Sequence, residues 1–174
     1  MRPILVVFLA VLTLALTSCG FQLRGAGGYE LAAESVSIVA NNSHSDFADE
    51  LEDTLKSIGV IVNPTESPQY VIRLNSETTT RRPVASSGNI TVSEYEVRLR
   101  AVFSISTAAG ETLVSDTALV TERIYSFDSR NFVSNTEEES VLVDEMRQDL
   151  AGQLVRRFSA TLRTKLAGET ITVP

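Results

Sequence analysis

Between Tyr95 and Ser106, apolar and polar residues alternate in a way that suits a β-strand with one buried face. One side of the strand carries Tyr95, Val97, Leu99, Ala101, Phe103 and Ile105, and the other carries Glu96, Arg98, Arg100, Ser104 and Ser106. Successive side chains of a strand point to opposite faces of its sheet. The chain is therefore expected to contain a sheet that packs one face on a core and leaves the other face polar.

Weaker patterns on either side of this strand predict the remaining elements. Apolar residues at every fourth position predict a helix over 46–58, capped by Ser45, and a second helix that opens with a Thr136–Glu139 capping box and ends at Gly168. Alternation predicts strands over 34–40, 70–75 and 111–125, with a long loop over 79–92. The order β-α-β-β-β-α predicts an α+β, two-layer sandwich in which two helices pack on one face of a four-stranded mixed sheet.

The N-terminal residues predict export and a lipid anchor. Arg2 is followed by an apolar run over 4–16, which is too short to span a bilayer comfortably and is typical of a signal peptide. The sequence Leu16-Thr17-Ser18-Cys19 resembles the bacterial lipobox, and Cys19 is the only cysteine of the chain. We therefore expect a lipoprotein signal peptide over 1–18, a lipidated tether over 19–30, and a single α/β domain over 31–174. The alternative is an ordinary signal peptide followed by a cysteine present by chance.

Composition and residue types argue against several classes of function. The 22 acidic residues outnumber the 15 basic ones, and the formal net charge of −7 argues against a nucleic-acid partner. His44 is the only histidine and lies in a polar stretch, so a histidine-based metal site or nucleophilic triad lacks its second component. Acidic runs within 49–53 and at 137–139 are typical of solvated helix surfaces. We expect no catalytic residue, no metal and no cofactor.

Two groups of arginines are candidates for binding. Arg81 and Arg82 are expected in the long loop, and Arg130 in the connection that leads to the last helix. Arginine binds phosphate and carboxylate through two parallel, charge-assisted hydrogen bonds. The alternative is that these arginines only keep the surface soluble. The second group lies on the polar sheet face and consists of Arg73, Glu96, Arg98, Arg100 and Arg123, which either pair across strands or contact a partner protein.

Several motifs together resemble one family of lipoproteins. The stretch Cys19-Gly20-Phe21-Gln22-Leu23-Arg24 resembles the C-G-[FW]-x-L-R opening of the LptE family, which assembles lipopolysaccharide in Gram-negative outer membranes. The similarity continues through Glu94-Tyr95, Tyr125-Ser126-Phe127-Asp128, Asp144-Glu145-Met146 and Arg156-Arg157. The resemblance implies a non-enzymatic plug inside the LptD outer-membrane β-barrel. In that role it assists assembly of the barrel and takes part in binding and inserting lipopolysaccharide at the outer leaflet.

The resemblance also implies where lipopolysaccharide would be bound. Family members use basic residues in the loop between the second and third strands and near the start of the last helix. The nearest equivalents in this chain are Gly88 and Asn135, which carry no charge. The nearby Arg81, Arg82 and Arg130 are the expected substitutes. Gly20, rather than Asp, after the cysteine favours the outer membrane, by similarity to the lipoprotein sorting rule of enteric bacteria.

Two other functions fit the same sequence. One is a pilotin-like lipoprotein that escorts a different outer-membrane protein, and the other is a cell-envelope enzyme such as a hydrolase. The identity of a copurified partner separates the first alternative from the barrel plug. The second requires dependence on His44 or on a carboxylate pair.

Overall fold

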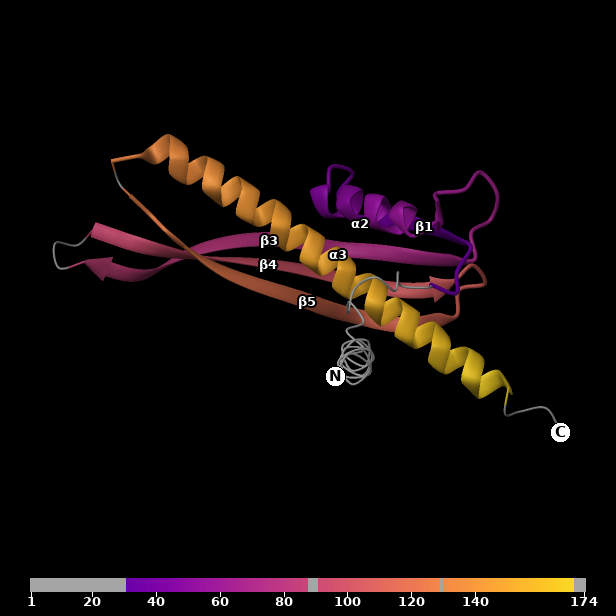
Figure 1. Ribbon diagram of the computed structural model, residues 1–174. Helices are drawn as coiled ribbons and strands as arrows, with labels where there is room; N and C mark the ends of the chain where they lie inside the picture. The colour runs from indigo at the N-terminus through magenta and orange to yellow at the C-terminus, as the bar shows by residue number, and fades with distance from the viewer. Residues whose placement is uncertain (1–30, 88–90, 129, 171–174) are drawn as a thin grey trace, which may run out of the picture.

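The computed structural model describes residues 31–87, 91–128 and 130–170. Its elements are β1 (Ser35–Ala40), α2 (Asp46–Ser57), β2 (Ile61–Val62), β3 (Tyr70–Ser87), β4 (Thr91–Thr107), β5 (Thr112–Ser126) and α3 (Phe132–Thr170). The strands form one mixed sheet in the order β2-β1-β3-β4-β5, with β1 parallel to β2 and β3, and with antiparallel β3-β4 and β4-β5 pairs. Both helices lie on the same face of this sheet (Figure 1).

The α+β sandwich is confirmed, with five strands instead of the four expected. The additional strand, β2, has only two residues, which pair with Ser35 and Val36 of β1. Two residues are too few to give an alternation pattern, so the sequence offered no signal for this strand.

The core lies between the sheet and the two helices. The alternating apolar residues Val97, Leu99, Ala101, Phe103 and Ile105 of β4 are all buried. They pack with Phe47, Leu51 and Leu55 of α2 and with Met146, Leu150, Leu154, Phe158 and Leu162 of α3. The four-residue spacing in each helix therefore marks its core-facing side, as predicted. Ser45 caps α2 as predicted, since its hydroxyl accepts a 3.2 Å hydrogen bond from the Ala48 amide.

The predicted loop over 79–92 is wrong, because β3 continues to Ser87 and β4 begins at Thr91. A register shift between Leu74 and Ser76 explains the error. Before the shift, the even-numbered Ile72 and Leu74 face the helices; after it, Glu77, Thr79 and Arg81 pair with core-facing residues of β4. A β-bulge inverts which residues point to the core. Because the residues on the helix side are polar after the shift, the sequence no longer alternates between apolar and polar residues there.

We call the part of the sheet beyond this shift the distal half: β3 from Ser76, β4 up to Val102 and β5 from Ala118. β1 ends at Ala40, which pairs with Leu74, so β1 does not accompany β3 into this half. Figure 1 shows α2 over the other half of the sheet and the start of α3 near the β3–β4 end. The distal half is thus a three-stranded ribbon covered by the first turns of α3.

α3 begins at Phe132, one turn earlier than the predicted Thr136 cap. The buried side chain of Asn135 explains the earlier start. Its amide donates a 2.7 Å hydrogen bond to the Asp128 carbonyl, and its carbonyl accepts one of 3.2 Å from the Asp128 amide. These bonds, together with the backbone bond from the Asn131 amide to the Asp128 carbonyl, turn the chain directly from β5 into the helix. Thr136 therefore lies inside α3 instead of at its cap.

Candidate functional site

The distal half brings together most of the residues that the sequence marked for binding. Arg81 and Arg82 lie on β3, opposite Val97 and Glu96 of β4. Because they are consecutive residues of a strand, their side chains point to opposite faces of the sheet. Arg81 points toward α3, whereas Arg82 lies on the face that carries no helix, which we call the open face.

Arg81 joins three elements on the helix side. Its guanidinium donates a 2.8 Å hydrogen bond to the Glu139 carboxylate of α3 and a 3.4 Å bond to the Tyr125 hydroxyl of β5. Its Cζ atom lies 4.5 Å from the centre of the Tyr95 ring, within cation–π range. The hydrogen bond to Glu139, and then the bond to Tyr125, raise the pKa of Arg81 above its ordinary value. Arg81 therefore ties the ribbon to the first turns of α3.

Aromatic residues complete this contact between ribbon and helix. Tyr95 stacks on Tyr125 with ring centres 6.1 Å apart, and it meets the edge of Phe127 at 5.1 Å. The buried Tyr125 hydroxyl donates a 2.6 Å hydrogen bond to Glu139. Burial, and then this bond, raises the pKa of Tyr125. We call Arg81, Tyr95, Tyr125 and Glu139 the distal cluster. Sequence analysis missed it because its members come from four separate elements.

Arg82 forms a bidentate ion pair with Glu96 on the open face. Its Nε and one terminal nitrogen donate hydrogen bonds of 2.7 and 2.9 Å to the two carboxylate oxygens of Glu96. The Glu96 side chain is only 11% exposed, whereas that of Arg82 is 69% exposed. The hydrogen bonds from Arg82 lower the pKa of Glu96. One edge of the guanidinium is thus occupied, while most of the side chain remains open to solvent.

Arg130 lies apart from the other two arginines, in the connection between β5 and α3. Its side chain is 89% exposed and pairs at 3.2 Å with the carboxylate of Asp128. The pKa of Asp128 is lowered, first by a hydrogen bond from the Arg130 backbone amide and then by the guanidinium. The three arginines therefore project from three surfaces of the distal end and form no single pocket.

Gly88 and Asn135 are the uncharged residues at the positions where the family resemblance implies basic ones. Asn135 is a buried cap, and Gly88 lies outside the described residues.

The rest of the open face carries both paired and unpaired arginines. Arg98 forms an ion pair with Glu122 of β5. Arg73 and Arg100 are exposed and have no ion-pair partner in the part of the chain that the structure describes. Arg123 was expected here, but its position opposite Val97 places it on the helix side, where it pairs with Asp149 of α3. The register between β4 and β5, which the sequence does not reveal, determines on which face of the sheet Arg123 lies.

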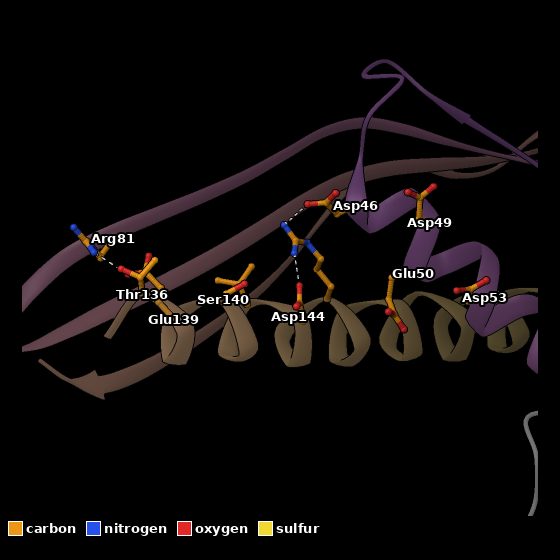
Figure 2. A pocket seen from close by; sticks show the side chains of 11 residues that line it. Asp46, Asp49, Glu50, Asp53, Arg81, Thr136, Glu139, Ser140 and Asp144 are labelled. Atoms are coloured by element: carbon orange, nitrogen blue, oxygen red, sulfur yellow. Dashed lines mark hydrogen bonds and ion pairs between the residues drawn. The ribbon is translucent and has the colours of Figure 1, made fainter. Parts of the chain in front are cut away.

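An acidic groove of about 810 Å³ runs between α2 and α3 (Figure 2). Its carboxylates are Asp46, Asp49, Glu50, Asp53, Glu139 and Asp144, and its cations are Arg81 and Arg147. Arg147 is 16% exposed and pairs with Asp46 at 2.8 Å, with Asp144 at 2.7 Å and with Glu77 of β3 at 3.1 Å. Glu77 also accepts a 2.8 Å hydrogen bond from the Ser45 hydroxyl. This network holds α2, α3 and β3 together and is structural in character.

Neither metal ligation nor membrane spanning is evident in the described ranges. No three of their histidine, cysteine, aspartate or glutamate side chains gather as metal ligands. Within residues 31–87, 91–128 and 130–170, no helix is long and apolar enough to cross a bilayer. His44 lies in the turn before α2, where its Nδ1 is 3.0 Å from the Ser43 hydroxyl. Cys19, the expected lipid attachment site, lies outside the described residues.

Solved structures share this architecture. Lipoprotein B of Nitrosomonas europaea is 26% identical, with a TM-score of 0.70 over 86% of this chain and 96% of that one. A minor lipoprotein of Acinetobacter baumannii is also 26% identical, with a TM-score of 0.62 over 75% and 93% of the two chains. Rare lipoprotein B of Shewanella oneidensis, 20% identical, supports the fold alone, with a TM-score of 0.65 over 76% and 98%.

The family comparison covers most of the folded region described above. No curated protein sequence matches the chain significantly. The model of the LptE family, described as lipopolysaccharide-assembly, matches residues 33–158. That range includes α2, all five strands and the first two thirds of α3. The chain therefore belongs to the LptE family of lipopolysaccharide-assembly proteins.

Proposed function

We propose that this protein is an outer-membrane lipoprotein that occupies the lumen of the LptD β-barrel. There it assists assembly of the barrel and takes part in binding and inserting lipopolysaccharide at the outer leaflet. The observation that carries the proposal is the family match over residues 33–158, because it spans α2, every strand of the domain and the first two thirds of α3.

The lipid anchor in this proposal is Cys19, released by cleavage of a signal peptide over 1–18. Residues 19–30 then join the lipid to the domain over 31–174. At about 3.4 Å per residue, a tether of this length reaches at most about 40 Å. Several acyl chains on one cysteine give an anchor that does not readily leave the membrane. The domain would thus stay close to the periplasmic mouth of its partner.

The surface of the domain suits a polar lumen. The open face carries ion pairs and exposed arginines such as Arg98 and Arg100, and the helical side carries the acidic groove. The interior of an outer-membrane barrel is polar, so a plug needs a polar exterior on more than one side. The ion pairs of the distal half also keep the ribbon rigid without an extensive apolar cover.

For lipopolysaccharide, we propose contacts with Arg82, Arg130 and Arg81 at the distal end. Arg82 and Arg130 have the most exposed guanidinium groups of the three, and each is held by one carboxylate on one side. Phosphate groups accept bidentate hydrogen bonds from arginine, so the exposed edges offer sites for lipid A or core phosphates. Arg81 would have to release Glu139 before it could contribute in the same way.

An affinity purification from gently solubilised outer membranes tests the main proposal. The protein would carry a C-terminal tag, so that Cys19 keeps its lipid, and a matched Cys19→Ser chain would control for the anchor. We expect a stoichiometric large β-barrel, LptD, in the eluate of the lipidated protein. A lipoprotein recovered without any barrel contradicts the proposal. Stoichiometric recovery of a different outer-membrane protein would favour the pilotin-like alternative.

A further inference from the structure

β5 forms one edge of the sheet along its whole length. The strand order ends at β5, and no strand in the described ranges pairs with its outer side. In an antiparallel pair, half of the backbone N–H and C=O groups of an edge strand point away from the neighbouring strand. Such a row of groups is a template for another strand unless the protein protects it.

The other free edge of the distal half is protected. β3 continues past β1 beyond Leu74, so its outer side also lacks a neighbouring strand in the described part of the chain. However, β3 contains Pro83 and three register shifts, at Leu74/Ser76, Pro83/Ala85 and Ala85/Ser86. Proline and bulges are the usual devices that prevent a strand from adding to an edge.

β5 lacks these devices in its distal half. From Thr117 to Ser126 it pairs with β4 in one uninterrupted register, and this stretch contains neither proline nor glycine. Of its two charged residues, Glu122 turns to Arg98 on the open face, and Arg123 turns to Asp149 on α3. Arg123 also donates a 3.0 Å hydrogen bond to the Glu122 backbone carbonyl, so it occupies one backbone acceptor of β5. The distal half of β5 is therefore a regular strand whose edge is interrupted by neither proline nor a bulge.

A hollow whose lining is part apolar and part acidic lies at the same edge. It has a volume of about 630 Å³ and is lined by Ile124, Tyr125, Ser126, Glu137, Glu138, Val141, Leu142 and Glu145. Ile124 and Val141 are 60% and 59% exposed. Ile124 faces the open side and Tyr125 the helix side, so the hollow extends around the edge of β5. Exposed apolar side chains at one edge favour a protein contact.

The rim of the hollow carries negative charge without compensation. Glu137, Glu138 and Glu145 are exposed, and none has an ion-pair or hydrogen-bond partner among the residues that the structure describes. The neighbouring Glu139, in contrast, is paired with Arg81. A ligand that fills the hollow would therefore gain from positive charge at its outer side.

We propose that the distal half of β5 accepts an extended strand from a partner protein, which adds to the sheet beyond β5. The strand alternates apolar residues with lysine or arginine: its apolar side chains lie beside Ile124 on the open face, and its cations point to the helix side, where the three rim glutamates of α3 lie. Backbone hydrogen bonds supply the affinity of such strand addition, and the side-chain pockets supply its specificity. The inference rests on the edge and the hollow and does not require the proposed lipopolysaccharide contacts.

A synthetic decapeptide of alternating valine and lysine is the probe, and an alternating valine–glutamate peptide is its control. The full lipidated chain in detergent would be titrated with each labelled peptide, and backbone hydrogen exchange would be measured with and without it. We expect the lysine peptide to bind and to slow exchange at amides within 117–126, while amides within 76–87 of β3 stay unchanged. Equal binding of both peptides, or slowed exchange on β3 in place of β5, would overturn the proposal, as would no binding.

Single substitutions distinguish peptide binding at this hollow from nonspecific binding to exposed apolar residues. Val141→Lys and Ile124→Lys should each weaken peptide binding about tenfold, because Ile124→Lys removes an apolar contact on the open face and Val141→Lys adds a positive charge beside the lysines of the peptide. Leu166→Lys changes an apolar residue elsewhere on α3 that is 50% exposed, and it should leave the affinity unchanged. All three positions are exposed, so thermal unfolding should be nearly the same as in the parent chain. Affinity that is insensitive to Val141→Lys and Ile124→Lys, or equally sensitive to Leu166→Lys, contradicts the assignment.

Discussion

The hydroxyl of Tyr125 on β5 donates a 2.6 Å hydrogen bond to the carboxylate of Glu139 on α3. It is a half-buried contact between the buried Tyr125 of the distal ribbon and the helix that covers it. Tyr125→Phe should lower the free energy of unfolding by about 2 kcal/mol, the usual range for a hydrogen bond to a charged acceptor. Urea denaturation measures this change. Tyr70→Phe is the control, since the Tyr70 ring keeps its contact with Phe158 and its hydroxyl has no hydrogen-bond partner in the described ranges.

The same tyrosine gives the protein a pH dependence in the alkaline range. Burial and the bond to Glu139 raise the pKa of Tyr125 above its ordinary value of 10.0. Its contribution to stability is therefore complete below pH 10 and is lost as the pH rises through the folded-state pKa, because the unfolded chain releases its proton first. Stability of the parent chain should fall more steeply above pH 10 than that of Tyr125→Phe. Parallel curves for the two proteins would contradict this role.

Substitution of Arg81 and of Arg82 should have different consequences. Arg81→Gln removes the ion pair with Glu139 and the cation–π contact with Tyr95, and it should cost about 1 kcal/mol of stability at this half-exposed site. Arg82→Gln should lower the free energy of unfolding by less than Arg81→Gln does. Its main effect should be on the pKa of Glu96. Loss of the two hydrogen bonds from Arg82 should raise this pKa toward its ordinary value, which carboxyl NMR titration measures. An unchanged Glu96 pKa would show that the pair does not persist in solution.

Lipopolysaccharide binding should depend on the two exposed arginines of the distal end. Arg82→Glu and Arg130→Glu should each weaken binding about tenfold, the equivalent of one charge-assisted contact. Titration with a fluorescent lipopolysaccharide measures the affinity, and the effect should shrink at high salt. Arg157→Glu reverses an exposed arginine in the second half of α3 and serves as the control. Equal loss in all three variants would indicate a general charge effect and would sink the assignment to the distal end.

The sequence predicted the elements whose apolar residues keep one period. The alternation of β4 and the four-residue spacing of α2 and α3 identified the core, because each of these elements buries one continuous side. β3 could not be followed past Leu74, since the bulge before Ser76 exchanges its faces and the stretch beyond it has few apolar residues. The start of α3 was misplaced because a Thr136–Glu139 box looks like a cap, whereas Asn135 and Asp128 form the actual turn.

The incorrect loop over 79–92 also misplaced the candidate binding residues. Arg81 and Arg82 were recognised by residue type, but a loop gave no reason to expect that their side chains point to opposite faces. A strand assignment would have placed them on opposite faces at once, and the β-branched run Thr78–Thr80 was the available signal for it. The partners Glu139 and Glu96 could not be identified, because cross-strand register and helix position arise from tertiary packing. Arg147 was overlooked for a similar reason, since its partners come from three different elements.

The ion pairs of Arg147 lead to a prediction about the free energy of unfolding. Arg147→Met removes the cation from a site where Glu77 is only 17% exposed, and it should cost about 2 kcal/mol because the half-buried carboxylate loses its partner. Adding Glu77→Gln should recover part of this loss, since glutamine keeps an acceptor for Ser45 without the charge. Arg157→Met, at an exposed position of the same helix, should have little effect. The single and double variants can be compared by urea denaturation, and no recovery in the double variant would refute the charge argument.

Substitution of Asn135 tests whether this position at the start of α3 can carry a cation. The family resemblance places a basic residue near this position, but the Asn135 side chain is 6% exposed and bonds both backbone groups of Asp128. Asn135→Ala should therefore cost about 1 kcal/mol, the typical value of a helix-capping side chain. Asn135→Lys should cost more, because lysine loses both bonds and must move its charge out of the turn. Backbone hydrogen exchange should then quicken over 132–140, with no gain in lipopolysaccharide affinity. A stable Asn135→Lys protein that binds lipopolysaccharide more tightly would show that the turn rearranges easily and that this position can hold a ligand-binding cation.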